Sequence, residues 1–157
     1  MSKVQGNDSQ DTQNIRQGLS TRESRLLARL AGAGNQIISV DDIETTLEVA
    51  PNTAREIASR LTEKGWLDRL FPGRYLIIPL AAGEEGRYTT HEYLIASHVA
   101  EPMYVGYYSA LEHHGLTEQV PRTVYVVTPS RAQSREIHGV PYRVVTVTER
   151  KFFGYEP

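Results

Sequence analysis

The chain has 157 residues, of which 39% are hydrophobic and 23% are charged, and its formal net charge is −2 at pH 7. This length suits one ordinary domain or two small ones. The chain contains no cysteine, which excludes a disulfide framework and thiolate metal sites. No run approaches the roughly 18 apolar residues of a membrane span, and no secretory signal pattern is found, so we expect a cytoplasmic protein.

The chain begins with a polar stretch, residues 1–18, rich in Gln, Asn, Asp and Ser. It has few apolar side chains to bury, which predicts a disordered tail. A capping-box pattern follows, in which the Ser20 hydroxyl and the Glu23 carboxylate can each accept from the other's backbone N–H. We expect a helix from here to about Ala31.

Two short helices are predicted next, after the short β-branched stretch Ile37-Ile38, which suits a small strand. Ser39 can cap a helix over Val40–Leu47. Pro51 suits the first turn of a second helix, which Gly65 ends. The second helix carries apolar residues at the spacing of one buried face: Ala54, Ile57, Ala58 and Leu61.

A hairpin follows the second helix, because residues 66–70 and 74–78 flank Phe71-Pro72-Gly73, a turn-forming sequence. Two angled helices followed by a β hairpin form a winged helix-turn-helix. We therefore predict this fold for residues 19–80. In such folds the second helix has the shape to enter the major groove of double-stranded DNA.

Charge supports this interpretation locally, because residues 51–75 hold five basic and three acidic side chains while the segments on either side are net acidic. Arginine and lysine contacts to phosphates dominate affinity for DNA. The predicted DNA-binding residues are Asn52, Thr53, Arg55, Glu56, Ser59, Arg60, Arg69, Arg74 and Tyr75. Those expected to read bases are Asn52, Thr53 and Arg55; those expected to contact phosphates are Arg60, Arg69 and Arg74. The alternative is a winged-helix protein-interaction module that binds no DNA.

Residues 81–88 are small, acidic and glycine-containing, which predicts a linker. We expect residues 89–157 to form a small α/β domain with a mixed or antiparallel sheet, so the whole chain is α+β. The expected elements are a helix from a capping box at Thr89–Glu92 to about Val99, a helix over Tyr107–His114, a central strand over Arg122–Thr128, a hairpin of residues 136–138 and 142–148 across Gly139-Val140-Pro141, and a short strand at Lys151–Phe153.

Few residues suggest chemistry. The five histidines lack metal-ligand spacing, and no phosphate-binding glycine motif is present. Ser109 and His113 are four residues apart, as in a serine–histidine pair, but no nucleophile elbow surrounds them. We therefore expect no catalytic residue, no cofactor and no metal site. The clustered tyrosines Tyr104, Tyr107 and Tyr108 suit either core packing or a partner surface.

Three further segments carry a family resemblance: Tyr107–Gln119, the strand Val124–Thr128, and Phe152-Phe153-Gly154. Together with the winged helix they make residues 20–157 resemble the AbiEi family, antitoxins and transcriptional regulators of type IV toxin–antitoxin systems. The resemblance implies that the N-terminal domain represses its own operon by binding inverted repeats in the promoter. Because one helix and wing cover few base pairs, we expect a homodimer or two copies on each operator. It also implies a C-terminal domain that counters a nucleotidyltransferase-like toxin. Family members continue beyond the Phe-Phe-Gly segment, so we expect this second domain to be shortened.

Overall fold

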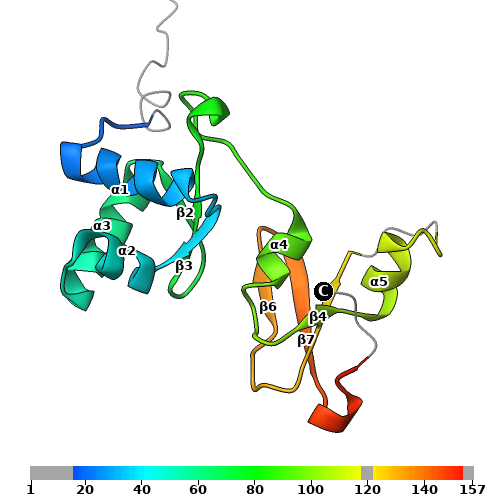
Figure 1. Ribbon diagram of the computed structural model, residues 1–157. Coiled ribbons are helices and arrows are strands. Elements are labelled where there is room, and N and C mark those ends of the chain that lie inside the picture. Colours follow the sequence, from blue (N-terminus) through cyan, green and yellow to red (C-terminus); the bar gives the residue numbers. More distant parts are fainter. Residues whose placement is uncertain (1–15, 118–121, 154–157) are drawn as a thin grey trace, which may run out of the picture. The chain divides into compact units, whose positions relative to one another are not determined.

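The computed structural model describes residues 16–117 and 122–153, apart from the side chain of Tyr108. The chain forms two compact units that divide between Thr89 and Thr90 (Figure 1). Most of the predicted disordered tail, residues 1–15, lies outside the described residues. The mixed α+β fold class is confirmed, and each unit is described by itself below.

The first unit is a winged helix-turn-helix. Its elements are α1 (Thr21–Gly32), β1 (Ile37–Ser39), α2 (Val40–Leu47), α3 (Pro51–Glu63), β2 (Leu67–Phe71), β3 (Arg74–Ile77) and the 3₁₀ helix η2 (Leu80–Ala82). The three strands form an antiparallel sheet in the order β1-β3-β2. β2 and β3 are the wing, and β1, which contains the predicted small strand Ile37-Ile38, pairs with β3.

Local signals set the helix boundaries. The Ser20 N–H donates to the Glu23 carboxylate at 2.8 Å, and the Glu23 N–H donates to the Ser20 hydroxyl at 3.2 Å, which completes the predicted capping box. Ser39 and Asp42 form a second capping box at the start of α2. Pro51 occupies the first turn of α3, where its missing N–H leaves no bond unmade.

The core of the first unit lies where the three helices meet the sheet. Leu26 of α1, Ile43 of α2, and Ala54, Ala58 and Leu61 of α3 are all fully buried. The apolar spacing predicted for α3 therefore does face the interior, which leaves the opposite face of the same helix to solvent. Full burial of each leucine or isoleucine among them stabilises the folded unit by about 1.5–3 kcal/mol.

The first unit extends beyond its predicted limits at both ends. The Arg16 guanidinium stacks 4.7 Å from the centre of the Trp66 ring and donates to the Pro79 carbonyl at 2.7 Å. The Arg16 backbone N–H donates to the Glu84 carbonyl at 2.9 Å, and the Trp66 indole N–H donates to the Gln17 carbonyl at 2.7 Å. Residues that we expected in the tail and in the linker therefore pack on the winged helix.

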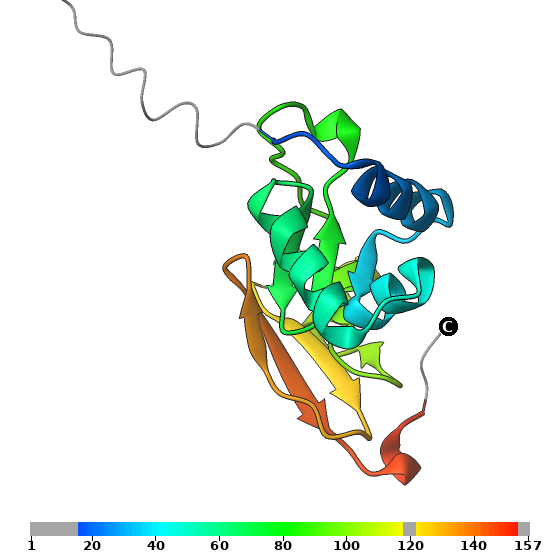
Figure 2. The same ribbon diagram turned by 90° about the vertical axis from the view of Figure 1, so that its left-hand side faces the viewer.

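The second unit is a mixed four-stranded sheet with helices. Its elements are α4 (Glu92–Ala96), β4 (Tyr104–Val105), α5 (Tyr107–His113), β5 (Val124–Thr128), β6 (Arg135–Ile137), β7 (Val140–Thr146) and the 3₁₀ helix η3 (Glu149–Lys151). The strand order is β4-β5-β7-β6, with β5 and β7 parallel and the other pairs antiparallel (Figure 2). The predicted strand over 122–128 is thus an inner strand.

Three local predictions in the second unit were wrong. The cap of α4 is His91, whose Nδ1 accepts from the Tyr93 N–H at 3.2 Å, and the helix ends at Ala96. The β6–β7 turn is His138-Gly139, both with positive φ, as a two-residue hairpin turn requires. In place of the strand expected at residues 151–153, Lys151 ends the 3₁₀ helix η3 and Phe152 and Phe153 belong to no regular element. No helix in the described part of the chain has the length and apolar content of a membrane span.

Candidate nucleic-acid interface

α3 presents a polar face to solvent. Its residues at the buried positions are 0–3% exposed, which fixes the rotation of the helix in the unit. The predicted contact residues fall on the other side: Asn52, Arg55, Glu56, Ser59 and Arg60 are exposed, and Thr53 is half-buried. Side chains of these types can donate to and accept from base edges and phosphates.

Two of these residues contact each other. Arg55 Nη1 donates a hydrogen bond to Asn52 Oδ1 at 3.0 Å, and both side chains are exposed. The bond occupies the Asn52 oxygen and holds the Arg55 guanidinium over the first turn of α3. Bidentate recognition of guanine needs an oriented guanidinium, and this hydrogen bond orients that of Arg55.

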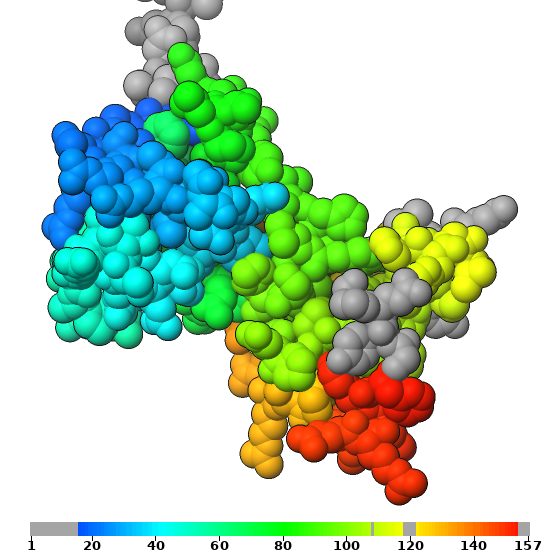
Figure 3. Space-filling view, in the orientation of Figure 1, coloured from blue at the N-terminus to red at the C-terminus, as the bar shows by residue number. Residues whose placement is uncertain are grey.

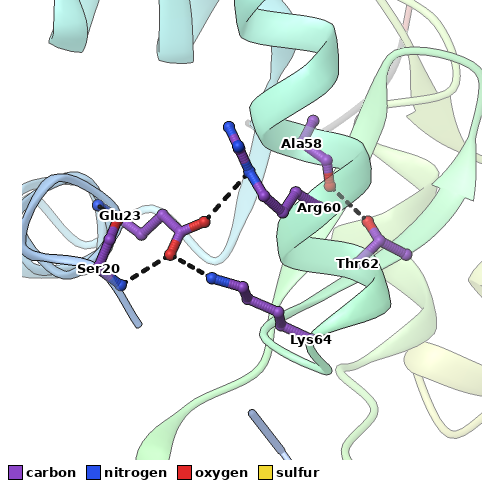
Figure 4. A network of polar contacts seen from close by, with 6 residues as sticks. All are labelled: Ser20, Glu23, Ala58, Arg60, Thr62 and Lys64. Atoms are coloured by element: carbon purple, nitrogen blue, oxygen red, sulfur yellow. Dashed lines mark hydrogen bonds and ion pairs between the residues drawn. The ribbon is translucent and has the colours of Figure 1, made fainter. Parts of the chain in front are cut away.

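The last turn of α3 is fixed to the first turn of α1 by a buried carboxylate. Glu23 is 4% exposed, accepts from Lys64 Nζ at 2.7 Å, and lies 3.5 Å from Arg60 Nε (Figure 4). Burial acts to raise the pKa of Glu23, but the hydrogen bonds from Lys64 and Ser20 outweigh it, and the pKa lies below its ordinary value. The contacts of Glu23 with Lys64 and Arg60 fix the position of the C-terminal half of α3 relative to α1.

The wing carries an arginine on each strand. Arg69 is exposed on β2, next to a bulge at Arg69/Phe71, and Arg74 is half-buried at the start of β3. Arg74 donates to the Gly73 carbonyl at 3.3 Å, which holds its guanidinium at the tip. Gly73 has a φ of 78°, a conformation that glycine adopts without strain.

Tyr75 is a correction to the predicted interface. Its side chain is 9% exposed and belongs to the hydrophobic core, with Ile77 of the same strand. Residues two apart on a strand share a face, so Tyr75 follows Ile77 toward the helices. The other eight predicted residues all reach the surface of the first unit, and their contact with DNA stays a prediction.

The exposed face of α3 has basic neighbours that its own sequence does not indicate. A hollow of 290 Å³ is lined by Ser20, Arg22, Glu23, Leu47, Thr53, Ile57, Arg60 and Lys64. Arg22 of α1 and Lys64, the C-cap residue of α3, were not predicted as site residues. The Glu23–Lys64 bond joins residues 41 positions apart, so only the fold brings them together. The capping-box pattern located Glu23 but gave no sign of its second partner.

The second unit does not assemble the Ser109–His113 pair. Ser109 is fully buried; its hydroxyl donates to the Thr123 carbonyl at 3.0 Å and accepts from the Tyr125 N–H at 3.2 Å. These hydrogen bonds connect α5 to β5 and to Thr123, which precedes that strand. Ser109 therefore has a structural role. Within residues 16–117 and 122–153, no three His, Asp or Glu side chains lie together as metal ligands.

A polar pocket of 320 Å³ lies beside Ser109. On its wall the Tyr93 hydroxyl lies 2.8 Å from Glu112 Oε2 and 2.9 Å from the Ser109 carbonyl. Burial and the Glu112 carboxylate raise the pKa of Tyr93 to about 12, so this hydroxyl keeps its proton at neutral pH.

Comparisons with known proteins agree with this architecture. Residues 25–78 match a family described as "Transcriptional regulator, AbiEi antitoxin". Among solved structures the chain is similar to the RV2827C protein from Mycobacterium tuberculosis, with 19% sequence identity and a TM-score of 0.59. That match covers 87% of this chain and 48% of the other, so this chain spans about half the length of that protein. At this identity the similarity shows the fold. No curated protein matches the sequence.

Proposed function

We propose that this chain, which over residues 25–78 belongs to the AbiEi family of antitoxin transcriptional regulators, binds double-stranded DNA with α3 and the wing. The observation that carries the proposal is the outward face of α3. It combines two exposed arginines with amide and hydroxyl side chains, and an arginine stands on each wing strand. In this arrangement α3 enters the major groove and the wing arginines reach the adjacent backbone.

The roles of the arginines differ. Arg55, oriented by Asn52, reads a base edge, while Arg69 and Arg74 neutralise phosphates. Arg60 keeps 55% of its side chain exposed beside Glu23 and serves as a phosphate contact. A single helix and wing cover few base pairs, so two copies bind the inverted repeats of a promoter, and the chain represses its own operon.

The test compares two variants of the full chain on one promoter duplex. Arg55→Ala should weaken binding by about 1–3 kcal/mol and relax sequence preference at one base pair. Arg74→Ala should weaken binding to all sequences. It should also lower the slope of log affinity against log salt concentration by about 0.9. Arg143→Ala, an exposed arginine of the second unit, is the matched control. Affinities unchanged from this control in both variants would refute the assigned DNA face.

A protein-binding role for the second unit is the second candidate, and the family description includes antitoxins. The observation that favours it is a pair of exposed apolar side chains four residues apart on α5: Tyr107 is 56% exposed and Leu111 is 40% exposed. Such pairs form one helix face and suit a protein partner. The partner in this proposal is a nucleotidyltransferase-like toxin. Loss of co-purification with such a toxin in Tyr107→Ser/Leu111→Ser would support it, and retained binding would refute it.

A further inference from the structure

α1 has a basic face that the proposed interface does not include. Arg22, Arg25 and Arg29 are exposed and follow the helical spacing of one face, opposite the buried leucines of the same helix. The acidic side chain of α1, Glu23, is buried and bonded to Lys64. The exposed face of α1 therefore carries three positive charges and no carboxylate of its own.

These arginines line a hollow that continues toward α3. The hollow has a volume of 550 Å³ and is lined by Thr21, Arg22, Arg25, Arg29, Thr46, Leu47 and Glu48. Arg22 and Leu47 also line the 290 Å³ hollow that reaches Thr53 and Arg60. In Figure 3 the blue surface of α1 adjoins the cyan surface of the residues that follow it. The basic face of α1 thus begins where the exposed face of α3 ends.

The C-terminus of α2 helps to hold this face. Arg29 donates from Nη1 to the Thr46 carbonyl at 3.3 Å, in the last turn of α2, which contains no basic residue of its own. A cation is favourable at this negative end of the helix dipole. Glu48 contributes one carboxylate to the rim, against three arginines.

From these observations we infer that Arg22, Arg25 and Arg29 form a second phosphate-binding surface for the DNA that α3 reads. The inference rests on the proposed function and lengthens the stretch of DNA that the first unit contacts. From Arg22 to Arg29 the helix rises by about 10 Å. That matches about three nucleotides of one strand, each rising about 3.4 Å along the DNA axis. The arginines complement the charge of the phosphates, and continuity with the α3 face selects DNA as the occupant over an acidic protein.

The test uses the full chain with Arg22, Arg25 and Arg29 all replaced by Gln, which keeps helix propensity. The control variant carries the same change at three exposed arginines of the second unit, Arg131, Arg143 and Arg150. Dissociation constants for the promoter duplex and for a random-sequence duplex are measured between about 50 and about 200 mM salt. Each lost phosphate contact lowers the slope of log affinity against log salt by about 0.9.

The expected result is a slope lower by up to about 2.7 in the α1 variant on both duplexes, with the ratio of the two affinities unchanged. The single variant Arg25→Gln should lower the slope by about 0.9 and guards against a folding defect in the triple variant. An α1 variant that behaves like the control, while Arg74→Ala still lowers the slope, would overturn the inference and leave the proposed function standing. It would also point to an acidic protein as the partner of this face. A wild-type chain that binds neither duplex would refute both.

Discussion

Replacing Glu23 with Gln removes the negative charge on which the first turn of α1 and the last turn of α3 converge. In the wild type the carboxylate accepts from Lys64 at 2.7 Å and from the Ser20 N–H at 2.8 Å, in a site only 4% exposed. Both donors bind the same oxygen, Oε2, and the amide oxygen of Gln can take its place, but it carries no negative charge to pair with the Lys64 ammonium. We therefore expect the free energy of unfolding of the first unit to fall at pH 7.

The magnitude follows from the contacts. A hydrogen bond between charged groups contributes about 1.5–3 kcal/mol, and a capping interaction contributes about 1 kcal/mol. The Arg60 pair is longer, at 3.5 Å, with 55% of the arginine side chain exposed, and it adds less than about 0.5 kcal/mol. Because the Gln oxygen can keep both hydrogen bonds at the strength of neutral groups, about 0.5–1.5 kcal/mol each, the expected loss at pH 7 is about 1–2 kcal/mol.

The pH dependence gives a second readout. The pKa of Glu23 is lowered in the folded chain, so its stabilisation is fully present above its ordinary pKa of about 4.3 and is lost as pH falls through the folded value. Gln does not titrate. The difference in free energy of unfolding between wild type and Glu23→Gln should therefore stay constant from about pH 7 to about pH 5 and become smaller below that.

The assay is urea unfolding followed by tryptophan fluorescence. Trp66 is the one tryptophan of the chain and stacks against Arg16, so its signal reports on the first unit. Glu63→Gln, an exposed change one residue from Lys64, is the control and should shift stability by less than about 0.5 kcal/mol. A Glu23→Gln variant as stable as this control at pH 7, or a difference that does not become smaller in acid, would refute the reasoning.

Two further substitutions test the fold. Ser109→Ala leaves the Thr123 carbonyl and the Tyr125 N–H without their side-chain partner, so the second unit should lose about 1–3 kcal/mol and the Tyr125 amide should exchange faster. The exposed Ser97→Ala is its control; equal exchange in both would count against the structural role of Ser109. Gly73→Ala forces a φ of 78° on a side chain and should cost about 1–2 kcal/mol by Trp66 fluorescence. The control is Gly32→Ala in α1, whose added methyl group meets open space and should not lower the free energy of unfolding. A Gly73→Ala variant as stable as wild type would argue against the assigned tip geometry.

Local signals were enough to predict the winged helix. Ser39, with Asp42 three residues on, marked the start of α2, and Pro51 marked the start of α3. Pro72 and Gly73 marked the turn of the wing. Each signal acts within four or five residues, so it needs no knowledge of tertiary contacts.

Contacts between distant residues could not be predicted in this way. The stacking of Arg16 on Trp66 spans 50 positions, and composition alone placed Arg16 in a disordered tail. A charge count over residues 1–50 hid the basic face of α1, because it pooled those arginines with the acidic residues of α2. Helical spacing within α1 would have revealed it.

Tyr75 was misassigned although a local rule was available. Alternation along β3 places Tyr75 with Ile77 on one face of the wing. The neighbouring Leu76 is buried as well, so the strand reads as continuously apolar and its two faces are not distinguished by polarity. The tyrosine hydroxyl made the residue look suitable for a DNA contact, and packing against the helices decided otherwise.

The most direct measurement is equilibrium binding of the full chain to two duplexes at about 150 mM salt. One carries the inverted repeat upstream of the chain's own reading frame, and the other carries the same base pairs in shuffled order. DNA reading by α3 predicts that the repeat is bound at least about 10³-fold more tightly, and that Arg55→Ala removes part of this preference. Equal affinity for both duplexes, or no binding to either, would contradict a sequence-specific regulator.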